Sequence, residues 1–174
     1  ASNREKIRVS LGKWFPTFPR SGLPSLEIRA YDFRMKMARQ VRHEGYTNRE
    51  PYCAAAVCYW VRDWLKDPAV LAALGMGTQE ANAWRCRSAA AFGWTNWAKE
   101  KGLLVMGDAA SNTLHKGDLM VFDMSHIGIV DTDEGDLVYT CEANTGATGS
   151  RDGEGVFYKT RKRSEARNFI RLLA

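Results

Sequence analysis

The 174 residues fit one domain of ordinary size, and a hydrophobic content of 45% is sufficient for a core. Charged residues make up 26% of the chain with both signs interspersed, which excludes a long disordered or linker segment. The net charge of +5 favours an anionic partner such as nucleic acid, a membrane surface or bacterial cell wall. The longest apolar stretches fall short of the roughly 20 residues that a membrane span needs.

The first 45 residues divide into two predicted parts. Residues 1–25 combine prolines with aromatic side chains, which predicts an ordered loop packed on the domain, with an aromatic arm that contacts substrate as the alternative. Apolar residues then recur at helical spacing between Ser25, a suitable N-cap, and Gly45, a suitable stop. We therefore expect a helix with one apolar face in this second part.

The rest of the chain changes from helical to strand-like patterns. Helices are predicted over residues 53–66, 68–74, 78–90 and 91–101. Short β-branched or aromatic runs predict strands at residues 118–123, 126–131, 137–142, 156–160 and 168–172. Turn signals separate these strands at residues 133–136 and 144–155. Helices followed by an antiparallel sheet are typical of an α+β domain.

Cys53 is the first candidate catalytic residue. Pro51 marks the entry into the predicted helix, so the Cys53 thiol lies in its first turn, near the positive end of the helix dipole. A helix N-terminus and a nearby imidazolium both raise the fraction of reactive thiolate. The alanines at 54–56 would let this helix lie close to a sheet. Local context alone leaves a catalytic and a structural Cys53 equally open.

The other three cysteines are predicted to be packing residues. Cys58 is rotated by about 140° from Cys53 around the helix and falls on the core face. Cys86 and Cys141 are predicted to be semi-buried small side chains. The spacing of the four matches neither a disulfide scaffold nor a zinc knuckle, so we expect mostly reduced thiols.

His126 is the candidate base, and two polar residues further along the chain could orient it. The histidine opens a predicted strand and shares a face with Gly128, which would leave room for a substrate backbone. A hairpin between 131 and 137 would lay Glu142 or Asn144 alongside His126. An acceptor at the second ring nitrogen fixes the tautomer and stabilises the charged ring. Glu142 can supply it; Asn144 could instead orient the ring or polarise a substrate carbonyl.

Taken together, these elements resemble the CHAP domain, the cysteine, histidine-dependent amidohydrolase/peptidase family. The matching segments are YCAAAV at 52–57, GDLMVF at 117–122, HIGIV at 126–130 and EAN at 142–144. The resemblance covers residues 46–174 as a core and leaves 1–45 as an N-terminal extension of one catalytic domain, 1–174. It implies a papain-like, CHAP/NlpC-type α+β fold with N-terminal helices packed on a C-terminal antiparallel sheet.

The resemblance also implies the residue roles and the substrate. Cys53 would be the nucleophile, His126 the general base and acid, Glu142 the orienting residue and Asn144 a supporting polar group. The reaction would be hydrolysis of a peptidoglycan amide bond, by an amidase or a peptide endopeptidase, with no metal or organic cofactor. Such an enzyme acts at the bacterial cell wall or periplasm; without a visible signal peptide it would be delivered by another route, and an effector would also have an immunity or delivery protein as partner.

Two other functions remain open on the sequence. The same thiol chemistry could serve an acyltransferase or a protease directed at proteins. A non-enzymatic basic module could hold wall polymer or nucleic acid, although the chain has no basic helix, aromatic sheet motif or metal knuckle that would favour nucleic acid.

Two charged runs complete the pattern. The acidic run at residues 131–136 carries oxygen ligands suited to calcium, but its position between two strands favours a simple hairpin turn. The basic run at residues 161–163 is expected to be a solvated strand end, with a binding patch as the alternative.

Overall fold

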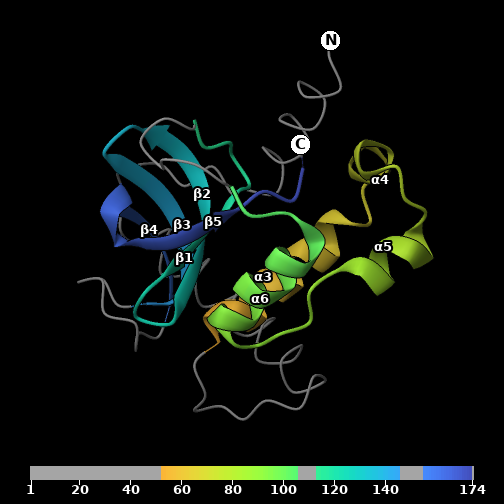
Figure 1. Cartoon of the computed structure of the whole chain (residues 1–174), viewed down its shortest axis with the longest axis horizontal. Coiled ribbons are helices and arrows are strands. Elements are labelled where there is room, and N and C mark those ends of the chain that lie inside the picture. The colour runs from red at the N-terminus through yellow and green to blue at the C-terminus, as the bar shows by residue number, and fades with distance from the viewer. Residues whose placement is uncertain (1–51, 106–112, 146–154, 174) are drawn as a thin grey trace.

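The structure is a computed structural model, and it describes residues 52–105, 113–145 and 155–173 (Figure 1). The predicted loop at 1–25, and the helix between Ser25 and Gly45, lie outside the described residues.

The helical half of the described chain follows the predicted order. The helices are α3 (Cys53–Trp64), α4 (Pro68–Leu74), α5 (Thr78–Trp84) and α6 (Ala91–Lys101). Asp67 caps α4 by accepting a hydrogen bond from the Ala69 N–H at 2.8 Å, and Pro68 follows at the first helical position. These local signals set the boundary that the sequence predicted.

The helix predicted over 78–90 ends early, at Trp84, because the chain beyond it is held by side chains of other helices. The carbonyl oxygen of Ser88 accepts hydrogen bonds from the Trp94 indole at 3.0 Å and from the Cys58 thiol at 3.3 Å. The Trp84 carbonyl accepts one from the Trp97 indole at 3.1 Å. Tertiary contacts thus replace the helical hydrogen bonds that residues 86–90 would otherwise make.

The strands form one antiparallel sheet in the order β4-β3-β2-β1-β5. Their bounds are β1 (Leu119–Phe122), β2 (His126–Glu134), β3 (Leu137–Thr145), β4 (Gly155–Lys162) and β5 (Ala166–Ile170). The predicted hairpin between β2 and β3 is present, with Gly135 in its turn at φ 76°. The predicted α+β class is therefore confirmed.

Helix α3 lies against the sheet, beside α6. It packs on β2 and β3, and α6 covers both α3 and the β1–β5 side, whereas α4 and α5 lie away from the sheet (Figure 1). Ala54, Ala56 and Val57 on α3 are fully buried and share a core with Ile127 and Ile129 of β2. Short side chains on this helix face allow the close approach that the sequence predicted.

A second, smaller core lies on the other face of the sheet, as strand alternation requires. Its buried members are Leu114, Met120, Phe122, Val130, Val138 and Phe169. In the described part of the chain, no helix has the length and apolar character needed to cross a bilayer.

Candidate active site

Cys53 is the first residue of α3. Its side chain is 4% exposed, and the first helical hydrogen bond of the helix runs from the Ala56 N–H to the Tyr52 carbonyl at 2.8 Å. The backbone N–H groups that come before Ala56 in this first turn have no acceptor within their own helix. The thiol therefore lies at the positive end of α3, where an anionic sulfur is favoured.

His126 is positioned by a tight turn between β1 and β2. Ser125 adopts a left-handed backbone at φ 58°, and its N–H donates to the Phe122 carbonyl at 3.2 Å. His126 then pairs directly with Phe122 across the two strands, and its ring lies against the Phe122 ring with centroids 5.4 Å apart. The imidazole is fully buried, so packing holds its orientation.

The two ring nitrogens of His126 face different partners. Nε2 lies 2.9 Å from Oε2 of Glu142. Nδ1 makes no hydrogen bond of good geometry within the described residues, yet the Cys53 thiol acts on the ring both as a hydrogen-bonding group and as a charge. The sulfur thus lies within interaction range of the imidazole without being aligned for a formed bond. Such bonds commonly tighten only when substrate binds.

Glu142 makes four contacts through its two carboxylate oxygens and is fully buried. Oε1 accepts from the Thr140 hydroxyl at 2.6 Å and from Nε of Arg161 at 2.8 Å. Oε2 accepts from Nη2 of Arg161 at 2.6 Å and faces His126. The structure thus brings Cys53, His126 and Glu142 into one connected group, whereas Asn144 belongs to β3 with a side chain outside the described residues.

A bulge in β2 is what brings Glu142 to the histidine. Near the hairpin turn, Thr132 pairs with Tyr139, but beyond Asp131 the register shifts and Gly128 pairs with Glu142. If the register near the turn continued without that shift, Ile129 would pair with Glu142, and His126 would lie on the opposite face of the sheet from the carboxylate.

The ionised form of Glu142 and the protonated form of His126 stabilise each other. Burial raises the pKa of Glu142, but hydrogen bonds from Arg161, His126 and Thr140 outweigh burial and lower that pKa to about 2. Burial lowers the pKa of His126, but the hydrogen bonds and charges of Cys53 and Glu142 outweigh burial and raise that pKa to about 9. At neutral pH the site therefore contains a carboxylate and an imidazolium.

The predicted role of Gly128 is wrong. A Cβ atom built on Gly128 would lie 2.7 Å from Cγ of Glu142 and 3.2 Å from the Cys141 carbonyl oxygen. The space beside this glycine is therefore filled by the carboxylate side chain and is not left for a substrate backbone.

We expect Gly128→Ala to push Glu142 away from His126. The clash should lower the free energy of unfolding by about 1–3 kcal/mol, the usual cost of overpacking, and should also lower kcat/KM. Chemical denaturation and steady-state kinetics would measure the two effects. Gly77→Ala is the matched control, because a Cβ there meets no atom within 4 Å; equal behaviour of the two variants would show that Gly128 does not shape the site.

The other three cysteines are buried, as predicted for Cys58 on the core face, whereas Cys86 and Cys141 are more deeply buried than the semi-buried positions predicted for them. The Cys58 thiol points to the Ser88 carbonyl. Burial raises the pKa of Cys86, and burial together with the negative charges of Glu142 and Asp131 raises that of Cys141 to about 12. Neither environment favours a reactive thiolate.

The prediction for the basic run was wrong at two of its three residues. Arg161 and Arg163 are 7% and 8% exposed and are paired with Glu142 and Asp133, so these two side chains belong neither to a solvated strand end nor to a binding patch. The acidic run forms the end of β2 and the hairpin turn, with Asp133 held by Arg163 and by the Leu114 N–H. Within the described residues, no group of three or more His, Cys, Asp or Glu side chains is arranged to hold a metal ion.

Comparison with protein-family models, curated proteins and solved structures finds no match for the chain. The class of the site is therefore defined by its chemistry: a cysteine at a helix start, next to a histidine that is held by a carboxylate.

Proposed function

We propose that the chain is a cysteine-dependent amidohydrolase or peptidase with a papain-like, CHAP-type catalytic domain. The observation that carries the proposal is the connected series of Cys53, His126 and Glu142, drawn from α3, β2 and β3. Helix dipole, imidazolium and buried carboxylate are the features that activate a thiol for attack on an acyl group.

In the proposed reaction, the Cys53 thiolate attacks the amide carbonyl and forms a tetrahedral oxyanion. Backbone N–H groups in the first turn of α3, which have no acceptor within their own helix, are suited to stabilise that charge. The His126 imidazolium gives its proton to the leaving amine as the C–N bond breaks, which leaves an acyl-enzyme and a neutral ring. The ring then takes a proton from water, whose oxygen attacks the thioester and releases the acid with the regenerated thiolate.

The substrate that we propose is an amide bond of bacterial peptidoglycan, cut by an amidase or endopeptidase action at the cell wall or periplasm. The resemblance of the four sequence segments to CHAP domains suggests this substrate. The net charge of +5 supports it, because a cationic protein is attracted to the anionic polymers of a wall.

Digestion of purified sacculi followed by mass spectrometry tests the proposal. We expect new fragments that differ from intact muropeptides by one hydrolysed amide, and their masses identify the bond. A new amide formed only when a free amine is added, with no hydrolysis of sacculi, would instead identify an acyltransferase. Cleavage of protein substrates alone would identify a protease.

A further inference from the structure

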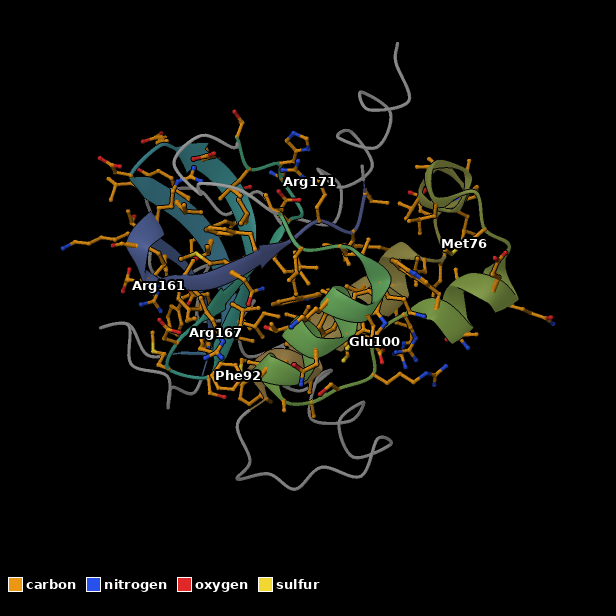
Figure 2. The ribbon with its side chains drawn as sticks, in the orientation of Figure 1. Met76, Phe92, Glu100, Arg161, Arg167 and Arg171 are labelled. Carbon is orange, nitrogen blue, oxygen red and sulfur yellow. The ribbon has the colours of Figure 1, made fainter. Side chains whose placement is uncertain are left out.

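The environment of Arg161 is specialised for one partner. Its guanidinium donates two hydrogen bonds to Glu142, one to each oxygen, at 2.8 and 2.6 Å. This forked arrangement fixes the plane of a carboxylate as well as its position, which a single-point contact cannot do. The side chain projects from the sheet, on the side away from α4 and α5 (Figure 2).

Phe122 forms a common surface for the base and for the arginine. Cζ of Arg161 lies 5.0 Å from the centroid of the Phe122 ring, and the His126 ring lies 5.4 Å from the same ring. The arginine is therefore held both by the carboxylate and by the aromatic ring against which the histidine packs. Its remaining nitrogen, Nη1, lies 3.9 Å from Oε1 of Glu165 at the edge of the site.

Charge balance explains why a cationic side chain occupies position 161. A buried carboxylate without a positive partner protonates readily, and a protonated Glu142 would be a poor acceptor for His126. The titratable or charged groups acting on Glu142 are His126 of β2 and Arg161 of β4, with Lys159 and Cys141 coupled to it through charge alone. Of these, only Arg161 binds both carboxylate oxygens.

We infer that Arg161 is a positioning residue for the Cys53–His126 pair: it keeps Glu142 ionised and turns its Oε2 atom toward Nε2 of the imidazole. The inference deepens the proposed function and rests on it for its catalytic consequence. Arg161 touches no reacting atom and acts through Glu142 alone. Its positive charge and the Glu142 carboxylate form one neutral pair beside the imidazole of His126.

The test compares Arg161→Met, Arg161→Lys and Arg163→Met as full chains. Arg163→Met is the matched control, because Arg163 is an equally buried arginine next along the same face and pairs with Asp133 instead of Glu142. Titration of the Glu142 side-chain carboxyl by carbon NMR reports its ionisation without any substrate. Steady-state kinetics on peptidoglycan fragments over a pH range report the consequence for turnover.

In Arg161→Met, the Glu142 midpoint should rise by about one to three pH units, the usual effect of removing a contacting cation. The acid limb of kcat/KM should move upward with it, kcat should fall more than KM rises, and Arg161→Lys should restore part of both effects. Arg163→Met should leave the Glu142 midpoint and the pH profile unchanged, even if it lowers stability.

An unchanged Glu142 midpoint in folded Arg161→Met, or an equal shift in Arg163→Met, would overturn the inference. A shifted midpoint with an unchanged pH profile of turnover would also overturn it, because the carboxylate would then not act through the histidine. A shifted midpoint in a protein that hydrolyses no peptidoglycan would support the ionisation step and reject the proposed substrate, so the two failures are distinguishable.

Discussion

Cys53→Ala should abolish hydrolysis of peptidoglycan, with kcat falling by about 10⁴-fold or more. Removal of a nucleophile eliminates the covalent route and leaves only the contribution of substrate binding and oxyanion stabilisation. Fragment release from sacculi, quantified by mass spectrometry, measures the loss. The change deletes one sulfur atom from the start of α3, so the fold should persist.

Cys58→Ala is the control for this prediction. Cys58 lies on the same helix and is also buried, but its thiol donates to the carbonyls of Ser88 and Cys86. This variant should keep most of the activity. Full activity in Cys53→Ala together with its loss in Cys58→Ala would show that the nucleophile has been assigned to the wrong cysteine.

Glu142→Ala should destabilise the protein as well as weaken its turnover. The substitution removes the carboxylate that pairs with Arg161 and faces His126, and so leaves the buried guanidinium without its main partner. Removing one member of a buried ion pair costs about 3–5 kcal/mol. Chemical denaturation should therefore show a lower unfolding midpoint, in addition to weak turnover.

The double variant Glu142→Leu, Arg161→Met separates charge from packing. Replacing both members of a buried pair by apolar groups is much less costly than stranding one of them. The double variant should therefore be more stable than Glu142→Ala, although still inactive. A Glu142→Ala protein as stable as the wild type would contradict the buried network described above.

The helices and strands were predictable because their signals are local. The apolar spacing of 53–66, the Asp67-Pro68 start of α4 and the β-branched runs after residue 118 each specify an element without reference to distant parts of the chain. The end of α5 was not predictable, since Trp84 and Ser88 are held by indoles of α6. Tertiary contacts decided that boundary.

The partners of the site were only partly predictable. Hairpin geometry and the family resemblance placed Glu142 near His126, but the bulge at Asp131 that brings His126 to the same face as Glu142 has no sequence signal of its own. Arg161 was missed for a related reason. Its reach to Glu142 depends on the register of β4 against β3, which a long connection between strands leaves open. Successive side chains in a strand point to opposite faces, so Arg161 and Arg163 were expected on one face and Lys162 on the other. This alternation was the one sequence signal that two of the three side chains could point inward.

Titration of the His126 ring by proton NMR tests most directly whether the thiol and the imidazole meet. The contact with Cys53 and Glu142 predicts a midpoint of about 9 in the wild type, above the ordinary value of 6.5, and a lower midpoint in Cys53→Ala. The ring would then stay protonated, and able to supply the leaving amine, until the pH rises through about 9. A midpoint near 6.5 that is the same with and without the Cys53 sulfur would contradict the account.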